Sequence, residues 1–216
     1  MNESDDTDKR LLMVRHGEST WNVLGLIQGQ ADGPTLTDKG RRQSAQLAER
    51  LRPGRAGAIY SSDLARARET AAFVGKALGL PVATDPALRE RCFGSYEGLP
   101  LRALDTVDSG ICGDQVVDPS ARPDGGESLD EVYERVGDFL ERLQGERHLG
   151  DVILVSHGGA IRAMRAFCAG VPMGGTPWDV VANGSVSTVH PLPRHGNNSE
   201  PREHGGLHAF NSPTAS

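Results

Sequence analysis

The segment LLMVRHG at residues 11–17 carries the strongest fold signal in the chain. Residues 11–14 are continuously apolar, which is typical of a strand buried on both faces of a sheet. A second such run, VILV at residues 152–155, also ends at a histidine and glycines, in SHGG at residues 156–159. Because the carboxyl ends of parallel strands lie at one edge of a sheet, we expect His16 and His157 to meet there.

Strand and helix patterns alternate along the rest of the chain. The sequence predicts further strands at residues 58–60, 82–84 and 186–189, and helices at residues 38–51, 64–78, 129–143 and about 160–168. Thr37 is a predicted helix N-cap, Gly79 ends the second helix, and Ser128 with Glu131 has the spacing of a capping box. This alternation predicts an α/β fold with a mostly parallel sheet covered on both faces.

Composition excludes several classes of protein. The 216 residues include 29 acidic and 23 basic side chains, a formal net charge of −6, which argues against a general nucleic-acid or anionic-membrane binder. No apolar run approaches the roughly 20 residues that cross a bilayer, and the acidic start lacks the pattern of a secretory signal. Three widely spaced cysteines favour a reducing, cytoplasmic location.

Both ends of the chain are predicted to be tails. Residues 1–9 are polar and acidic, and residues 191–216 are rich in Pro, Gly, Asn, Ser and His without an apolar period. Residues 10–190 show no internal repeat and no linker, so we expect one domain there. Within it, residues 99–127 form the predicted cap loop, because they are irregular and rich in Gly, Asp and Pro.

Two arginines accompany the two histidines. Arg15 directly precedes the first histidine, and Arg66 lies in the first turn of a predicted helix, near its positive end. Gly17 and Gly158 follow the histidines and allow a close backbone approach and unusual torsions. Two imidazoles and two guanidiniums at strand ends would form a receptor for a phosphate dianion.

The motifs around these residues resemble those of the histidine phosphatase superfamily, which has the phosphoglycerate-mutase-like fold. In chain order they are RHGE at 15–18, WN at 21–22, QG at 28–29, LTDKG at 36–40, SSDLARA at 61–67, LRERCFG at 88–94, GGES at 125–128 and SHGG at 156–159. They cover about residues 10–190. The resemblance implies a three-layer α/β/α sandwich with a mostly parallel central sheet.

The resemblance also implies a role for each matched position. His16 is expected to attack phosphorus and become a phosphohistidine. Arg15, Arg66 and His157 are expected to bind the phosphoryl oxygens and stabilise the charge of the transition state. Further contacts with the phosphate are expected from Asn22, Gln28, Gly29 and Gly158.

Glu90 matches the proton donor of the family. It is expected to protonate the departing alkoxide and then to deprotonate the water that hydrolyses the phosphohistidine. Glu18 and Glu97 are the alternative carboxylates. No metal is expected, because arginines and histidines supply the positive charge and no metal-ligand motif occurs.

The predicted activity is hydrolysis of a small phosphorylated metabolite by a metal-independent phosphatase without a cofactor. Related mutases use a longer, basic capping segment, whereas residues 99–127 hold two arginines against six acidic residues. A cofactor-dependent phosphoglycerate mutase is therefore the first alternative. A non-catalytic phosphate-binding regulatory protein is the second, although it would lack residues that this chain retains. The expected partner is a small-molecule phosphate ester, with no nucleic acid and no membrane, and a homodimer is compatible with the fold.

Overall fold

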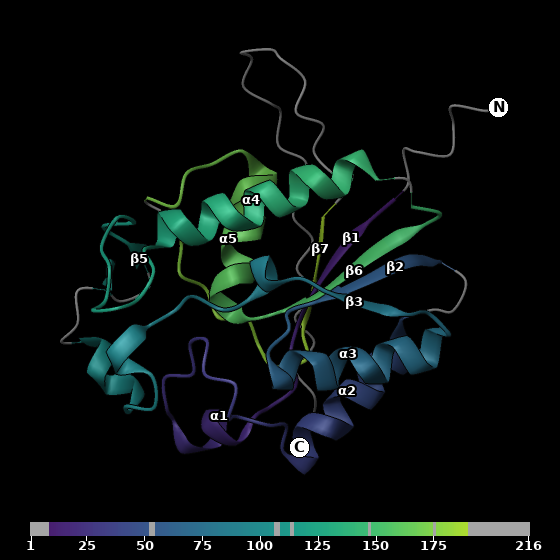
Figure 1. Cartoon of the computed structure of the whole chain (residues 1–216), viewed down its shortest axis with the longest axis horizontal. Helices are drawn as coiled ribbons and strands as arrows, with labels where there is room; N and C mark the ends of the chain where they lie inside the picture. Colours follow the sequence, from purple (N-terminus) through teal and green to yellow (C-terminus); the bar gives the residue numbers. More distant parts are fainter. Residues whose placement is uncertain are drawn as a thin grey trace.

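The computed structural model describes residues 9–51, 55–105, 109–112, 115–146, 148–174 and 176–189. Its main sheet has the strand order β3-β2-β6-β1-β7 (Figure 1). The strands are β1 (Leu11–Arg15), β2 (Ala56–Ser61), β3 (Val82–Thr84), β6 (Asp151–Ser156) and β7 (Val186–Val189). Strands β3, β2, β6 and β1 run parallel, and β7 pairs antiparallel with β1 at the edge. The predicted mostly parallel sheet is confirmed.

Helices cover both faces of this sheet (Figure 1). They are α2 (Asp38–Arg50) and α3 (Ala65–Leu78) on one face, and α4 (Leu129–Gly145) and α5 (Gly158–Ala169) on the other. Successive side chains of a strand point to opposite faces. Leu11 and Met13 of β1 accordingly pack with α4 and α5, whereas Leu12 and Val14 pack with α2 and α3. The predicted three-layer α/β/α sandwich is therefore present.

The ends of the helices follow from their capping residues. The Thr37 hydroxyl accepts a hydrogen bond from the N–H of Gly40 at the start of α2. Ser128 and Glu131 form both bonds of a capping box at the start of α4. Gly79 ends α3 in the left-handed conformation, with φ of 67°. A side-chain N-cap stabilises a helix by about 1 kcal/mol and involves residues within one turn. The starts of α2 and α4 could therefore be predicted from the sequence.

Some short elements differ from the prediction. Helix α1 (Thr20–Leu24) was not predicted, and α5 begins at Gly158, earlier than expected. The predicted irregular cap contains the 3₁₀ helix η4 (Leu101–Asp105) and an antiparallel pair, β4 (Ile111–Cys112) with β5 (Gln115–Val116). Two further 3₁₀ turns, η2 (Pro86–Leu88) and η3 (Gly94–Tyr96), flank the Glu90 loop. Such elements are too short to show a hydrophobic period.

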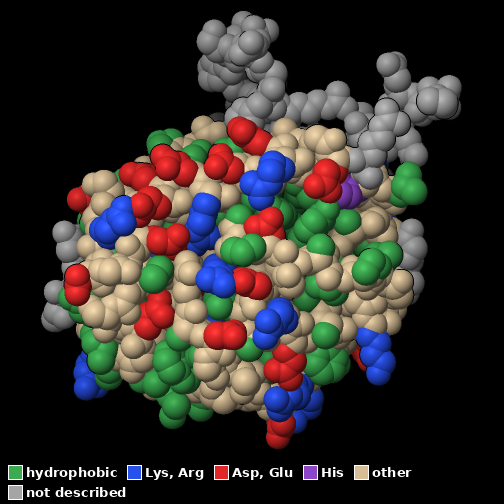
Figure 2. Space-filling model, viewed as in Figure 1, with side chains coloured by type: hydrophobic (Ala, Val, Ile, Leu, Met, Phe, Trp, Pro, Cys, Tyr) green, Lys and Arg blue, Asp and Glu red, His purple; other side chains and the backbone are tan. Residues whose placement is uncertain are grey.

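The predicted tails, residues 1–9 and 191–216, lie outside the described residues apart from Lys9. The division of the chain into two tails and a single domain over residues 10–190 stays a prediction. Across the described ranges, every helix is too short or too polar to cross a bilayer. Acidic and basic side chains are interspersed on the face shown in Figure 2.

Candidate active site

The two central strands bring the predicted histidines together. His16 follows β1 and His157 follows β6, and these strands pair in parallel with Arg15 opposite Ser156. The centroids of the two imidazole rings lie 5.1 Å apart. Only 2% of His16 and 0% of His157 is exposed. The two buried rings thus lie next to each other at the carboxyl ends of β1 and β6.

The tautomer of His16 follows from its hydrogen bond. Its Nδ1 lies 2.7 Å from the backbone oxygen of Gly17. A carbonyl oxygen only accepts hydrogen bonds, so this contact assigns the ring proton to Nδ1. Nε2 of His16 is left with its lone pair and is the nitrogen that can act as a nucleophile.

The orientation of His157 is set by Ser62. Nε2 of His157 lies 2.9 Å from the hydroxyl oxygen of Ser62, which accepts a hydrogen bond from the N–H of Leu64. The Ser62 hydroxyl is therefore free to donate its proton to Nε2 of His157. When Ser62 donates in this way, the ring proton of His157 is on Nδ1, where it can be donated to a ligand.

The two predicted arginines are held by carbonyl groups. Arg66, the second residue of α3, is fully buried and donates to the carbonyls of Ala31 at 2.8 Å and Gly29 at 2.7 Å. Arg15 at the end of β1 donates to the carbonyl of Val181. Because these acceptors are neutral, they orient both guanidiniums without cancelling their charge, which remains available to an anion.

Three buried nitrogens of this cluster have no hydrogen-bond partner. Among the described residues, Nε of Arg15, Nε of Arg66 and Nδ1 of His157 are sealed from solvent and unpaired. Buried polar groups in native proteins are almost always paired with protein, water or ligand. A phosphoryl group bound beside His16 would offer oxygen acceptors to Nε of Arg15 and Nε of Arg66, and to Nδ1 of His157 when that nitrogen carries the ring proton.

The buried cluster changes the acidity of its members. Burial, together with the charges of Arg66 and Arg15, lowers the pKa of His16 well below its usual 6.5. Burial and the same arginines lower the pKa of His157 in the same way. Burial also lowers the pKa of Arg66, to about 10, against the opposing charge of Glu90, so Arg66 stays charged at neutral pH. Two neutral imidazoles thus lie beside two cations.

This arrangement predicts that stability falls on acidification. Above pH 6.5 both imidazoles are neutral in the folded and unfolded chain, so they contribute no pH dependence. Below that pH only the unfolded chain protonates them, so it binds up to two more protons. The free energy of unfolding should then fall by up to about 2.7 kcal/mol per pH unit. Urea unfolding between pH 7 and pH 5 measures this slope. In His16→Ala the slope of the free energy of unfolding against pH should be about half that of the wild type. The same slope in both proteins would contradict the prediction.

Glu90 lies at the N-terminus of α5. Its carboxylate accepts hydrogen bonds from the backbone N–H groups of Gly159 at 3.0 Å and Ala160 at 3.3 Å, and from that of Arg91 at 2.8 Å. The first N–H groups of a helix lack carbonyl partners within it, so they are natural donors to a carboxylate. Glu90 is only partly buried, whereas His16, His157 and Arg66 are buried.

The glycines after the histidines serve close approach rather than unusual torsions. Gly17, Gly158 and Gly159 have no positive φ, contrary to the expectation of unusual torsions. A Cβ on Gly159 would lie 2.4 Å from Oε1 of Glu90, and one on Gly17 would lie 2.4 Å from the carbonyl oxygen of Gly40. A side chain at Gly159 would displace the Glu90 carboxylate.

The alternative carboxylates are engaged elsewhere. Glu18 pairs with Lys39 at 2.9 Å and accepts the hydroxyl of Thr37, which together lower its pKa against burial. Oε1 of Glu97 accepts the backbone N–H groups of Gln30 and Phe93. Neither bonds to the start of α5. Glu90 remains the candidate for acid and base.

The other predicted contacts lie around this centre. The amide oxygen of Asn22 accepts the side-chain N–H of Asn183 at 3.2 Å, and that of Gln28 accepts the hydroxyl of Ser19 at 2.7 Å. These bonds leave the amide NH₂ groups as the donors for an anion. Gly29 orients Arg66 through its carbonyl, and Gly158 opens α5 with an N–H that has no partner within the helix. Direct phosphate contact by Asn22, Gln28, Gly29 and Gly158 stays a prediction.

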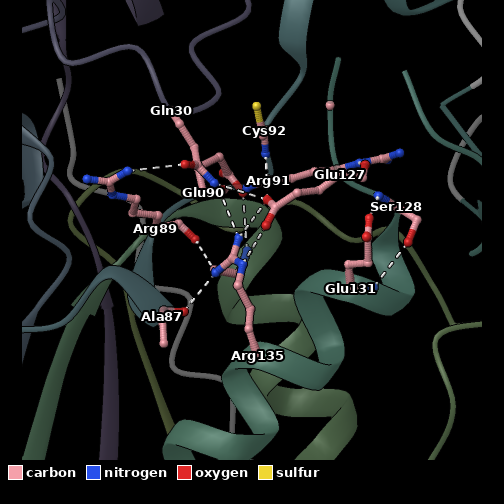
Figure 3. Close-up of polar contacts among 12 residues, drawn as sticks. Gln30, Ala87, Arg89, Glu90, Arg91, Cys92, Glu127, Ser128, Glu131 and Arg135 are labelled. Carbon is pink, nitrogen blue, oxygen red and sulfur yellow. Dashed lines mark hydrogen bonds and ion pairs between the residues drawn. The ribbon is translucent and has the colours of Figure 1, made fainter. Parts of the chain in front are cut away.

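Arg135 on α4 holds the backbone of the Glu90 loop (Figure 3). It donates to the carbonyls of Ala87 at 2.7 Å and Arg89 at 2.9 Å through Nη1, and to the carbonyl of Glu90 at 3.0 Å through Nη2. One guanidinium thus bonds three carbonyls of a loop that has no regular structure at Glu90. This fixes where the Glu90 side chain leaves the backbone.

Glu127 and Gln30 join Arg135 in holding this loop, and these three residues are called the clamp below. Its carboxylate pairs with Arg135 at 2.9 and 3.0 Å, and its Oε2 accepts the N–H of Cys92 at 2.8 Å (Figure 3). Oε2 also accepts the side-chain N–H of Gln30 at 3.1 Å, and that amide bonds the carbonyl of Glu90 at 3.1 Å. The loop is therefore held on both sides of Glu90.

Loss of the clamp should impair acid catalysis selectively. We expect Arg135→Gln to reduce kcat on an alkyl phosphate by about ten- to a hundredfold, since small displacements of a reacting group cost this much. The loss in the rate of transfer from p-nitrophenyl phosphate to His16, measured as the initial release of nitrophenolate, should be smaller, because this leaving group needs no proton. Arg142→Gln on the same helix, where Arg142 pairs with Asp85, is the matched control. Equal losses on both substrates would make Arg135 a purely structural residue.

Sequence reasoning missed several residues of this site. Arg135 and Asn183 gave no local signal, because their partners lie far away along the chain; Asn183 bonds the carbonyl of His16. Arg162 had a readable signal, since it follows Gly158 by four residues and so lies on the same face of α5.

The sequence and the fold are similar to those of proteins in one family. A family model described as histidine phosphatase superfamily (branch 1) matches residues 11–201. In Arabidopsis thaliana, "Phosphoglycerate mutase-like protein 4" is 39% identical over 169 residues, covering 75% of this chain and 72% of that protein. "Metal-independent phosphoserine phosphatase" of the same organism is 37% identical over 193 residues, covering 87% and 78%. The structure of a mycobacterial glucosyl-3-phosphoglycerate phosphatase with VO3 has a TM-score of 0.70 and 33% identity, covering 83% of this chain and 90% of the other.

Proposed function

This chain belongs to the histidine phosphatase superfamily, and from that premise we propose that it hydrolyses a small phosphate monoester through a phosphohistidine at His16. The observation that carries the proposal is the set of three unpaired buried nitrogens around the neutral Nε2 of His16. Relatives named as phosphatases support hydrolysis as the reaction.

The residues divide the reaction into two steps. In the first, Nε2 of His16 forms a bond to phosphorus as the ester P–O bond breaks, and protonated Glu90 gives its proton to the leaving oxygen. In the second, the Glu90 carboxylate takes a proton from water, the water oxygen bonds to phosphorus, and the N–P bond breaks. Arg15, Arg66 and Nδ1 of His157 stabilise the charge on the phosphoryl oxygens in both steps.

The engagement of basic residues near the cap favours a phosphatase over a mutase. Arg91 is buried and donates to the carbonyls of Glu127, Ser109 and Ala121, so it anchors the cap. Arg122 pairs with Glu131. The guanidiniums of Arg91 and Arg122 are thus used by the protein, and Arg102, the other arginine of residues 99–127, is exposed. A mutase, in contrast, must hold a bisphosphorylated intermediate and exclude water from it.

Product analysis tests this assignment. The purified protein should release inorganic phosphate from a panel of small monoesters, with the panel repeated in EDTA. It should convert 3-phosphoglycerate to 2-phosphoglycerate more slowly than it releases phosphate, even with 2,3-bisphosphoglycerate as primer. Dominant isomerisation would identify a mutase, and absence of any turnover would favour the non-catalytic alternative. Strong inhibition by EDTA would contradict metal independence.

The proposed location and partners of the protein are inferred from its composition and its candidate site. The three cysteines are unpaired, as is usual in a reducing compartment, and this supports a cytoplasmic location. The proposed partner is a small-molecule phosphate ester. The predictions of no nucleic acid, no membrane and a compatible homodimer stay predictions.

A further inference from the structure

A third guanidinium lies next to the phosphoryl site. Arg162 is on α5, one turn after Gly158. A Cβ built on Gly158 would lie 3.3 Å from Nη1 of Arg162 and 3.8 Å from Nε of Arg15. Arg162 and Arg15 therefore both lie next to Gly158, the residue that follows His157. Arg162 has no role in the reaction steps described above.

Arg162 is held firmly along one edge of its guanidinium. Nε and Nη2 both donate to the carbonyl of Asp179, at 2.7 Å for Nε, and the guanidinium lies 4.2 Å from the centre of the Trp178 ring. Its side chain is only 12% exposed. Within the described part of the chain, Nη1 has no hydrogen-bond acceptor. The protein thus fixes the plane of the group and leaves one nitrogen with two N–H donors for a ligand.

The charge of Glu90 connects Arg162 to the reaction. Burial lowers the pKa of Arg162, and the Glu90 charge opposes this effect, as it does for Arg15 and Arg66. Glu90 is therefore close to all three cations. Arg15 and Arg66 accompany His16, where the phosphoryl group is transferred. Of the three cations, Arg162 is therefore the one available to bind the leaving group of the substrate, which Glu90 protonates.

We propose that Arg162 binds a carboxylate on the leaving group, so that the preferred substrates are phosphate esters of small hydroxy acids. This inference rests on the proposed function. The oxygen that Glu90 protonates must lie against Glu90, whose carboxylate accepts the N–H of Gly159, and Nη1 of Arg162 lies beside the neighbouring Gly158. A carboxylate on a neighbouring carbon of the leaving group is the part of the substrate that would meet Nη1. Two N–H donors on one nitrogen suit the oxygens of a monoanion. The nearby carboxylates of Glu90 and Asp179 disfavour a second dianionic phosphate.

Matched pairs of substrates test the proposal. O-phospho-L-serine differs from O-phosphoethanolamine by its carboxylate alone, and 3-phosphoglycerate differs from glycerol 3-phosphate by carboxylate in place of CH₂OH. We expect kcat/KM to be about ten- to a hundredfold higher for the carboxylated member of each pair, the range typical of hydrogen bonds to charged groups. Arg162→Gln should abolish this preference mainly by raising KM for the carboxylated esters.

A control on the same helix separates binding from structure. Arg165 also pairs with Asp179, at 2.8 Å, and Arg165→Gln should keep the preference. Equal losses on both members of a pair in Arg162→Gln would overturn the proposal, because they would indicate a structural role. Equal wild-type activity on both members would also overturn it while leaving the phosphatase assignment intact. Failure of every ester would instead refute the proposed function, and this inference with it.

Discussion

His16→Ala is expected to lower kcat by about four orders of magnitude or more, the largest effect of any single substitution in this site. The hydrogen bond from Nδ1 of His16 to the carbonyl of Gly17 leaves the lone pair on Nε2 of His16 available for attack. Removing it leaves the arginines to bind phosphate without a group that can accept the phosphoryl. Phosphate binding should therefore persist in the variant while turnover is lost.

Labelling the protein checks this result directly. Acid-sensitive, base-stable phosphate should accumulate on the wild-type chain during turnover of a ³²P-labelled ester and be absent from His16→Ala. His148→Gln is a matched control, because His148 is also shielded from solvent but lies edge-on to the ring of Tyr60, away from the site. It should keep the label. A label that survives in His16→Ala would place the nucleophile on another residue.

Glu90→Gln is expected to have the second largest effect, and the effect should depend on the leaving group. An alkyl phosphate should lose about a hundred- to ten-thousandfold in kcat, because its alkoxide needs a proton from Glu90. Transfer from p-nitrophenyl phosphate to His16 should lose far less. The second step still lacks its base, so nitrophenolate should appear as a burst of about one equivalent, followed by slow release.

Rapid-mixing kinetics on the two substrates measure this difference. Glu18→Gln is the control, since Glu18 is engaged by Lys39 and Thr37. It should show neither the burst nor a dependence on the leaving group. If Glu90→Gln lost the same factor on both substrates and gave no burst, Glu90 would have no role as acid or base.

Local patterns in the sequence were enough to predict the frame of the molecule. The apolar runs that end at His16 and His157 predicted two central strands, because burial on both faces of a sheet leaves a continuous apolar run. Thr37, Gly79 and Ser128 predicted helix ends, because capping depends on neighbours within a few residues. The meeting of the two histidines followed from the parallel order of the strands.

Only the tertiary structure decided how the site is held and charged. The contact of His157 with Ser62, the carbonyl partners of Arg15 and Arg66, and the clamp from Arg135 all depend on segments that are distant in sequence. The placement of Arg162 beside Gly158 depends on the carbonyl of Asp179 and the ring of Trp178. Periodicity along a chain reports which face is buried, whereas these contacts are determined by which segments pack against each other in three dimensions.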